Sequence, residues 1–381
     1  MAYVAARGGE EAIQQAERLY RALNGRVSIE QVRSIEQHLP YLVDRVMGEG
    51  SLYAPELAAL AIAQTGGDLY EALLLLRAYR STQPRVAYAE PVTDSSLLTV
   101  RRISAAFRDI PGGQVLGPTL DYSHRILHTN VLEDGEAGET RDEPAAADTV
   151  ASPSFPPVAR WQRLNGLLDP LPELPPVDPA GLPDVTREPI AFPAPREHRL
   201  QSLARADTGG VLALGYASMR GYGLTHPTVN ELKLAYADVR LRHPITGEPF
   251  SVGRVRLSQC EVVTTFAHEQ AKLGLGFAAT MGWNEVKTMA ASMLDMEMDR
   301  TDGHPAHSDE FVLYHTEPVE ASGFCIHYKL PHYVTFNSAL DNIRSAQRPD
   351  AKAGVGGNGS GPEPEAVGET VTQRNSQEAL V

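Results

Sequence analysis

Twelve prolines lie between residues 151 and 195, and they limit what this 381-residue chain can fold into more than any other feature. Proline has no amide hydrogen to donate and its ring fixes φ, so most of this stretch is excluded from helices and central strands. We therefore expect an extended connector that wraps a surface or links two folded regions. Trp161 and the leucines from Leu164 to Leu168 predict that part of the connector docks on a core.

The residues before the connector predict a helical N-terminal region over residues 1–82. Apolar residues recur there at helical spacing in four stretches. Asp68, followed three residues later by Glu71, matches a capping box at the start of the fourth stretch. The four stretches are EAIQQAERLYRAL, residues 29–47, PELAALAIAQ and LYEALLLLRAYR.

Two less regular regions follow. Residues 83–130 mix glycines, prolines and arginines, which indicates a loop region. Residues 131–195 form the acidic and proline-rich connector, with the acidic residues concentrated in 131–148. At the other end of the chain, residues 346–381 are rich in Gly, Pro, Glu and Ser, which predicts a disordered tail.

Residues 196–345 predict an α+β domain. Apolar residues indicate strands at 211–217, 251–266, 311–315 and 324–330, and the last two could pair with each other. Asn284 is placed as the N-cap of an amphipathic helix. One face of that helix is predicted to pack in the core and carries Val286, Met289, Met293 and Met296.

The predicted fold class is therefore α+β. It combines a helical N-terminal region, a proline-rich connector and a mixed α/β C-terminal region with antiparallel strands. No run approaches the roughly 18 apolar residues of a membrane span, and the charged N-terminus does not match a signal peptide. These features predict a cytoplasmic protein.

Charge and cysteine content narrow the function classes. A net charge of −14 argues against a nucleic-acid surface, which needs a basic stripe. A local arginine cluster could still bind an anionic small molecule. Cys260 and Cys325 are the only cysteines, too few for a secreted disulfide framework or for an iron–sulfur cluster held by this chain alone.

Two glycine- and arginine-containing segments are candidate anion sites. In the first, Arg108 precedes Gly112 and Gly113, and glycines let backbone N–H groups approach an anion closely. No Gly-Lys-Ser/Thr follows, so an irregular structural loop is the favoured alternative. In the second, Arg220 lies beside Gly221. There a phosphate or sugar site and a turn between two strands fit the residues equally well.

Five histidines fall within 29 positions near the C-terminus. Zinc requires three or four N, S or O ligands. His304 and His307 could contribute with Asp309 or Glu310, whereas solvated or hydrogen-bonded imidazoles are the favoured alternative for His327 and His332. A site at that pair would need Cys325, another loop or a partner chain. The five are His304, His307, His315, His327 and His332.

Several long segments together resemble one family, the PhnI subunit of the bacterial carbon–phosphorus lyase core complex. The resemblance covers most of residues 1–343. The segments are LVDRVMGEGSLYAPELAALAIAQ, GDLYEALLLLRAYR, RRISAAFRDIPGGQVLGPTLDY, GYASMRGYGLTHPTVNEL and FCIHYKLPHYVTF.

The resemblance implies a role in phosphonate catabolism. With its partners, the family's subunit displaces adenine from MgATP by an alkylphosphonate and gives alpha-D-ribose 1-methylphosphonate 5-triphosphate. Alone, it acts as a purine nucleosidase. The implied partners are the PhnG, PhnH and PhnJ subunits and a PhnL-type ATPase-like subunit. The family further implies zinc at the interface with PhnJ, with His327 and His332 as ligands and the partner completing the site.

The implied reaction requires a carboxylate near the ribose and basic groups near the triphosphate. Breaking the bond between C1′ and the purine passes through an oxocarbenium-like state, which a carboxylate stabilises. Asp121 and Glu231 are the predicted carboxylates. Arg108, Gly112, Gly113 and Arg220 are predicted to contact the triphosphate, which Mg²⁺ accompanies.

Two alternatives remain open at this point. The chain could be a non-catalytic scaffold whose helices and connector wrap its partners, or a zinc hydrolase with its own metal site. Release of adenine from MgATP would show that the chain is an enzyme, and no release would favour the scaffold. Zinc bound stoichiometrically by the isolated chain would support the second.

Overall fold

The computed structural model describes six stretches of the chain and divides it into two units. One unit is Arg7–Lys329, and the other is Leu330–Val381 with Met1–Ala6. The predicted disordered tail lies outside the described residues from 349 onward, and the acidic segment lies outside them from 136. The described stretches are residues 9–135, 155–172, 181–220, 226–265, 272–300 and 303–348.

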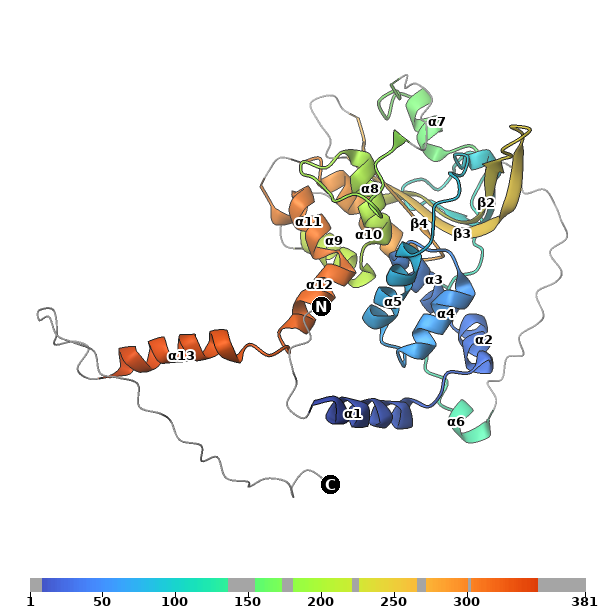
Figure 1. Cartoon of the computed structure of the whole chain (residues 1–381). Helices are drawn as coiled ribbons and strands as arrows, with labels where there is room; N and C mark the ends of the chain where they lie inside the picture. Colours follow the sequence, from blue (N-terminus) through green and yellow to red (C-terminus); the bar gives the residue numbers. More distant parts are fainter. Residues whose placement is uncertain are drawn as a thin grey trace, which may run out of the picture. The chain divides into compact units, whose positions relative to one another are not determined.

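The N-terminal part of the larger unit is helical, as predicted (Figure 1). The predicted helix over residues 29–47 is divided in two, because Pro40 begins a new helix at its first position. Asp68 is the N-cap of the fifth helix and accepts hydrogen bonds from the backbone N–H groups of Tyr70 and Glu71. The helices are α1 (Gly9–Asn24), α2 (Ile29–His38), α3 (Pro40–Gly50), α4 (Pro55–Gln64) and α5 (Leu69–Ser81).

Helices α2 to α5 share one apolar core. Small alanines on α4 let the helices approach closely, and larger side chains from α3 and α5 fill the space between them. This burial holds the four helices together as one body. Its fully buried members include Val43, Met47, Ala58, Ala59 and Ala72.

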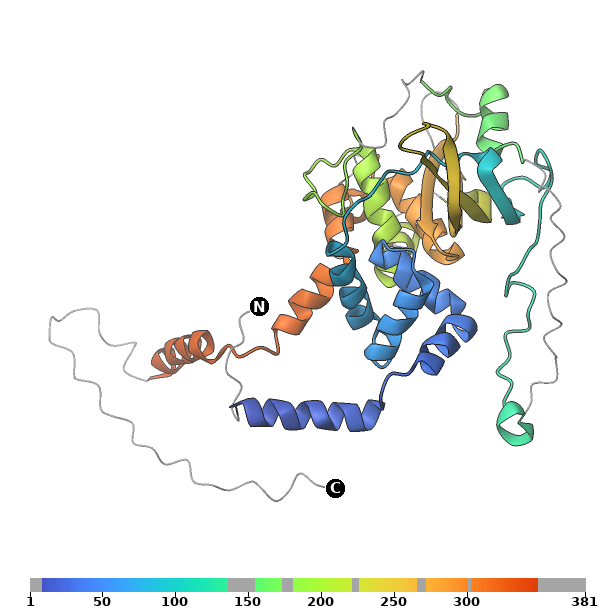
Figure 2. The same ribbon diagram turned by 45° about the vertical axis from the view of Figure 1, so that its right-hand side comes forward.

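A four-stranded antiparallel sheet forms the centre of the larger unit (Figure 1, Figure 2). The strands follow one another in space as they do in sequence. The register places Glu231 opposite Glu261, Leu232 opposite Cys260, and Arg102 opposite Lys233. The strands are β1 (Leu97–Ile103), β2 (Thr228–Arg242), β3 (Pro249–Thr264) and β4 (Gly274–Met281). The strand predicted at 251–266 is therefore confirmed over residues 251–264, which lie in β3, and residue 266 lies outside the described residues.

The apolar face of the sheet packs on α10 (Glu285–Glu297). Leu232 and Cys260 meet Met289 of this helix, and Met293 is buried, so the predicted core role of these methionines is confirmed. Val286 is exposed instead. Asn284 is the N-cap, as predicted, and accepts a hydrogen bond from the backbone N–H of Lys287.

Three predicted strands are helices in the structure. Residues 211–217 lie in α9 (Thr208–Arg220), residues 311–315 form most of α11 (Asp309–His315), and residues 324–327 end α12 (Pro318–His327). Each predicted strand is short, and an apolar run of that length fits a helix as well as a strand. The pairing predicted between the last two strands is wrong for the same reason.

Helix-start signals explain why the three segments are helical. Asp207 accepts a hydrogen bond from the backbone N–H of Gly210 in the first turn of α9. Ser308 caps α11 through Phe311, and Glu317 caps α12 through Glu320 ahead of Pro318. These caps satisfy backbone donors that a strand would have left for a neighbouring strand.

The described parts of the proline-rich connector pack on the fold, as predicted. Within it, α7 (Val158–Leu164) buries Val158, Ala159 and Gln162, and the Trp161 ring lies edge-on to Phe107 with 5.3 Å between centroids. Residues 196–205 then form α8 (Arg196–Arg205), which contacts β4. The other short elements are η1 (Asp94–Ser96), α6 (Val131–Asp134) and η3 (Pro305–His307).

The smaller unit contains one described helix, α13 (Tyr333–Gln347), which buries none of its residues. Within the six described stretches, no helix is both long enough and apolar enough to cross a membrane. The boundaries proposed for five regions of the chain stay predictions.

Gly276 of β4 offers a test of how closely α10 approaches the sheet. A Cβ atom built there would lie 2.0 Å from the carbonyl oxygen of Ser292. We expect Gly276→Ala to lower the free energy of unfolding by at least about 2 kcal/mol, because two backbone segments would have to separate. Guanidinium unfolding measures this value.

Gly323→Ala on α12 is the matched control, since nothing lies within 4 Å of a Cβ at that position. Alanine is the better helix former, so this variant should keep or gain stability, by up to about 1 kcal/mol. Equal losses in both variants would contradict the close approach.

Candidate functional site

Two buried arginines occupy adjacent positions on β1 and organise the region that contains most of the predicted site residues. Neighbouring side chains on a strand point to opposite faces of the sheet. Arg101 is paired with Glu285 of α10, and it also donates to Asp121 at 2.6 Å. Arg102 is paired on the other face with Glu231, with 2.5 Å between Nε and Oε1.

Glu231 lies at the centre of a buried charged network. Its side chain is 1% exposed, and its second oxygen is 3.2 Å from the ammonium of Lys233. Lys233 also pairs with Asp94 at 2.7 Å, and the backbone N–H of Val158 points at Glu231 from 3.4 Å. The carboxylate is thus surrounded by cations and donors from β1, β2 and the connector.

The glycine loop is folded around the guanidinium of Arg102. One of its terminal nitrogens donates to the carbonyl oxygens of Pro111 at 2.8 Å and Gly113 at 2.7 Å. Gly112 and Gly113 both have positive φ, which is why glycine suits this turn. The N–H of Gly113 donates to the carbonyl of Ile110. The loop therefore presents carbonyl groups to an arginine.

The two predicted carboxylates lie apart. Asp121 is 46% exposed, and it is held by Arg101 and, at 3.2 Å, by Arg125. Glu231 is bound to Arg102, on the opposite face of β1. The structure makes Asp121 the accessible member of the pair.

A second buried glutamate faces Glu231 across β2 and β3. Burial raises the pKa of Glu261 to about 7, and the negative charge of Glu231 adds to the effect. A hydrogen bond from the Asn230 amide, at 2.9 Å, works in the opposite direction. Asn230 also exchanges two amide hydrogen bonds with Gln162 of α7, at 2.7 and 3.0 Å. The polar face of the sheet is thus covered by the connector.

The arginines predicted to contact the triphosphate are exposed. Arg108 is 92% exposed, and its ion-pair partner is the neighbouring Asp109, at 3.1 Å. Arg220 is the exposed last residue of α9, and residues 221–225 beyond it lie outside the described residues. These two arginines remain predictions.

The histidines near the C-terminus make local contacts, and the ring centroids of His304 and His307 lie 5.0 Å apart. His307 and Glu297 are both buried and lie 2.8 Å apart, and His304 caps η3 through the backbone N–H of Ala306. His315 lies 2.7 Å from the carbonyl of Phe311. In the part of the chain that the structure describes, no group of three or more His, Cys, Asp or Glu side chains is arranged to hold a metal.

His327 and His332 belong to different units, and each has the same local geometry. The Nδ1 atom of His327 lies 2.6 Å from the carbonyl of Phe324, and that of His332 lies 2.5 Å from the carbonyl of Leu330. A carbonyl at that distance places the ring proton on Nδ1 and the lone pair on Nε2, the form in which imidazole binds a metal. The donor chemistry therefore fits zinc.

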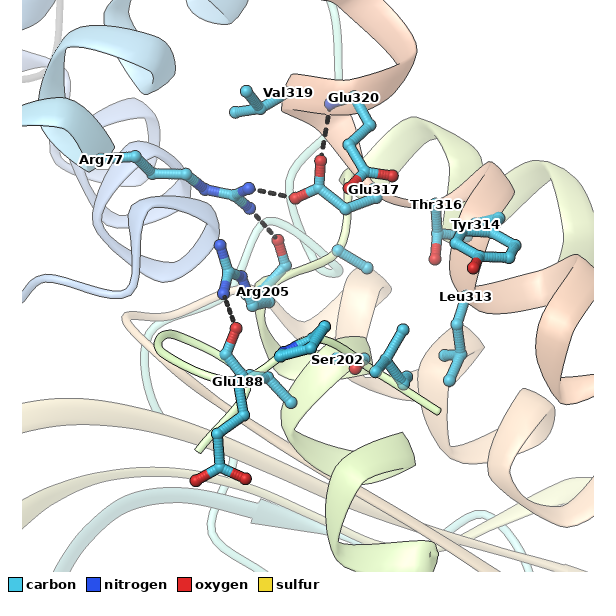
Figure 3. Close-up of a pocket in the computed structure, with 14 residues that line it drawn as sticks. Arg77, Glu188, Ser202, Arg205, Leu313, Tyr314, Thr316, Glu317, Val319 and Glu320 are labelled. Atoms are coloured by element: carbon cyan, nitrogen blue, oxygen red, sulfur yellow. Dashed lines mark hydrogen bonds and ion pairs between the residues drawn. The ribbon is translucent and has the colours of Figure 1, made fainter. Parts of the chain in front are cut away.

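A pocket not anticipated from the sequence lies where α5, α8, α11 and α12 meet the segment before α8 (Figure 3). It measures about 920 Å³, including its open mouth. Its walls combine apolar groups such as Ile190 and Leu313 with Arg77, Arg205 and Glu317. None of the predicted catalytic, triphosphate or zinc residues lines it.

Arg77 connects several of the elements that form the pocket. Its guanidinium is paired with Glu317 and donates to the carbonyl oxygen of Arg205 at 3.1 Å (Figure 3). It also donates twice to the carbonyl oxygen of Glu49, at 2.8 and 2.9 Å. Arg205 donates to the carbonyl of Val185 at 2.7 Å. Burial and the nearby charge of Arg77 lower the pKa of Arg205 to about 10. The lining holds these two arginines against three glutamates, Glu188, Glu317 and Glu320, so the pocket is amphipathic and has no excess of positive charge.

Sequence reasoning missed Arg77 and Arg205 for a definable reason. Arg77 follows four leucines in an apolar helical run. An arginine in such a run is predicted to lie on the solvent-exposed face of the helix. Its partners come from α3, α8 and α12, up to 240 positions away. The Glu317–Pro318 pair was the one local signal, since it marks the start of a helix.

Comparison with known proteins gives a consistent result. The family model described as "Bacterial phosphonate metabolism protein (PhnI)" matches residues 2–350. HtxH of Stutzerimonas stutzeri, named as a C-P lyase subunit protein, is 45% identical, and the match covers 91% of this chain and 96% of HtxH.

Two further relatives carry the name "Alpha-D-ribose 1-methylphosphonate 5-triphosphate synthase subunit PhnI". The protein of Rhizobium meliloti (strain 1021) is 41% identical over 93% of this chain and 97% of its own length. That of Escherichia coli (strain K12) is 40% identical over 91% of this chain and 98% of its own length.

The buried Glu261 predicts a pH dependence of stability. Its pKa in the folded state, about 7, lies above the ordinary 4.5, so its favourable contribution is complete below pH 4.5 and is lost as the pH rises through 7. Glu261→Gln cannot ionise. We expect the stability of this variant relative to the parent to rise by on the order of 3 kcal/mol from about pH 4.5 to about pH 8.

Urea unfolding at the two pH values measures the effect. Glu56→Gln, at an exposed site on α4, is the control and should show no such change. A difference between Glu261→Gln and the parent that stays constant with pH would contradict the buried position of Glu261.

Proposed function

Because the chain belongs to the PhnI family of bacterial phosphonate metabolism proteins, we propose that it acts as a subunit of alpha-D-ribose 1-methylphosphonate 5-triphosphate synthase. The observation that carries this proposal is the extent of the match. Two relatives with that name are 40% and 41% identical to the chain, over more than nine-tenths of each protein.

The proposed reaction is a displacement at C1′ of the ribose of MgATP. The bond from C1′ to adenine breaks, a bond from C1′ to an oxygen of an alkylphosphonate forms, and adenine leaves with a proton. Without partners, water would replace the phosphonate, and the chain would act as a purine nucleosidase. Mg²⁺ would neutralise part of the triphosphate charge.

The roles of individual residues follow from exposure and pairing. We assign Asp121 as the carboxylate that faces the developing cation, because its carboxylate is accessible and Arg101 and Arg125 hold it in place. The catalytic role of Glu231 stays a prediction. Its buried pair with Arg102 gives it a positioning role, since Arg102 holds the glycine loop.

The triphosphate contacts proposed for Arg108, Arg220 and the backbone of Gly112 and Gly113 rest on residue type. The N–H of Gly113 donates to the carbonyl of Ile110, so a contact from Gly113 would require that bond to open. Both arginines are accessible to a ligand in solution. Each could place a guanidinium on a phosphate oxygen, which is the interaction that arginine makes best.

His327 and His332 are proposed to supply two nitrogens to zinc, with a PhnJ-type partner completing the ligand set. The lone pair on Nε2 of each ring supports this role. Zinc bound by both chains would cross-link the subunits. Exposed Phe324 and Tyr328 near His327 give that surface the aromatic character typical of protein interfaces. PhnG, PhnH and a PhnL-type subunit complete the proposed set of partners.

A scaffold role is the second candidate, and one observation favours it. Helix α1 buries none of its 16 residues, although Ile13, Leu19, Tyr20 and Leu23 are exposed and apolar. An amphipathic helix without a covered face is typical of a segment that docks on another chain.

Adenine release separates the two functions. We expect the purified chain to release adenine from MgATP, and the assembled subunits to yield the ribosyl phosphonate when methylphosphonate is added. Chromatography of free adenine measures both reactions. Absence of adenine in both cases would contradict the enzymatic proposal and support the scaffold role.

Within that assay, Asp121→Asn should lower the rate of adenine release by roughly 10²- to 10⁴-fold, the range typical of a single catalytic acid, base or charge-stabilising group. Asp341→Asn is the control, because Asp341 is also an exposed carboxylate paired with an arginine of its own helix. Equal rates in the two variants would refute the role of Asp121.

Zinc content tests the two histidines directly. We expect His327→Ala and His332→Ala each to remove interfacial zinc from the purified complex, since two imidazole ligands are half of a tetrahedral set. Adenine release by the chain itself should survive. Metal analysis of the complex provides the measurement.

His38→Ala is the control, because this exposed imidazole has the same local geometry, with Nδ1 2.9 Å from the carbonyl of Ser34. That variant should retain its zinc. Full zinc in complexes of His327→Ala and His332→Ala would show that other residues hold the metal.

A further inference from the structure

A second hollow of the larger unit carries an excess of positive charge. It lies between the C-terminal end of α5, the segment that follows it, and residues 186–187. Three arginines line it, Arg80, Arg85 and Arg187, and no carboxylate is among its lining residues. In a chain with a net charge of −14, such a local cluster stands out.

The three arginines converge on one short segment. Arg85 is paired with Asp184, and Nε of Arg187 lies 3.9 Å from the same carboxylate oxygen. Arg80 donates to the carbonyl of Thr186 at 3.3 Å. Arg85 also lies over the ring of Tyr88, 4.9 Å from its centroid, which fixes its direction. The guanidinium groups are therefore held in place before any ligand arrives.

Asp184 does not neutralise this cluster. It brings one negative charge against three positive charges, and its other oxygen accepts hydrogen bonds from the N–H and hydroxyl of Thr186, at 2.9 and 2.5 Å. Burial works to raise the pKa of Asp184, but the bonds from Thr186 and the charges of Arg85 and Arg187 outweigh it and lower this pKa. The carboxylate stays ionised, and about two positive charges remain uncompensated.

The excess of positive charge leaves Arg80 in an unfavourable environment. Its Nε is buried and has no hydrogen-bond partner among the described residues. Burial lowers the pKa of its guanidinium, and the charges of Arg77, Arg85 and Arg187 lower it further, against the effect of Asp184. Arg80 is partly buried, and a cation with a buried donor that lacks a partner is unfavourable, so a bound anion nearby would stabilise it.

We propose that this hollow is a binding site for an oligophosphate or phosphonate anion, held by Arg80, Arg85 and Arg187. Guanidinium groups bind phosphate and phosphonate oxygens in pairs of parallel hydrogen bonds. The hydroxyl group of Ser51 and the amide of Gln83 also line the hollow and suit the same oxygens. The hollow, about 1300 Å³ including open solvent, is large enough for a triphosphate.

The proposal does not depend on the synthase reaction. It concerns anion binding, so a chain that binds triphosphate but releases no adenine would refute the proposed function and leave this site intact. Conversely, a variant that releases adenine but no longer binds free triphosphate would support the proposed function. It would also show that this site takes no part in the reaction.

Calorimetric titration of the full chain with sodium triphosphate tests the site. We expect one triphosphate per chain, bound more weakly as the salt concentration rises. Arg85→Gln with Arg187→Gln should weaken binding by roughly 100-fold, because each charge-assisted contact contributes about tenfold or more. Arg187→Gln alone should keep the fold, since Arg187 is 51% exposed and its ion pair is long, and should weaken binding about tenfold.

The matched control is Arg21→Gln with Arg344→Gln, which removes the same charge from two arginines that are 71% and 66% exposed and paired on their own helices. Its affinity should be that of the parent. Equal affinity of parent and Arg85→Gln/Arg187→Gln would overturn the site, and equal weakening in both double variants would show a net-charge effect and overturn it too.

Competition identifies the source of the anion. Displacement of bound triphosphate by MgATP would assign the site to the polyphosphate of a nucleotide. Displacement by methylphosphonate would assign it to the phosphonate group. Either result supports the site, whereas lack of saturation with triphosphate alone would refute it.

Discussion

The buried pair of Arg102 and Glu231 is the interaction on which the site region depends. It joins β1 to β2, and through Arg102 it holds the carbonyl groups of Pro111, Gly113 and Pro156. Removing one partner of such a pair leaves a buried charge, which typically costs about 3–5 kcal/mol. One ion pair therefore fixes a sheet edge, the glycine loop and the start of the connector helix.

The two faces of the sheet differ in character, one apolar and one polar. Its apolar face is packed on α10, with Gly276 permitting close approach to the helix backbone, and it supplies stability. Its polar face buries Glu231, Lys233 and Glu261 beneath the connector. Buried charges are retained only where they are well paired, so this face depends on the connector remaining docked.

Periodicity and caps were sufficient for the long elements. The helices from α1 to α5, the strand β3 and the helix that begins after Asn284 were predictable because each has a repeating apolar pattern or a clear start signal. The predictions from short apolar runs were wrong at residues 211–217, 311–315 and 324–330, because five to seven residues carry too little periodicity to separate a strand from a helix. The capping residues Asp207, Ser308 and Glu317 held the missing information.

The family, the α+β class and the docking of the connector were predictable from the sequence, because these depend on long segments and on the conformational limits of proline. The pairing of the charged side chains, by contrast, depends on the three-dimensional fold. Arg77 reaches Glu317 across 240 positions, and Arg85 reaches Asp184 across 99. Asp121 and Glu231 pair with Arg101 and Arg102, which point to opposite faces of β1. Such contacts require chain segments distant in sequence to be close in space, and no local pattern records that distance.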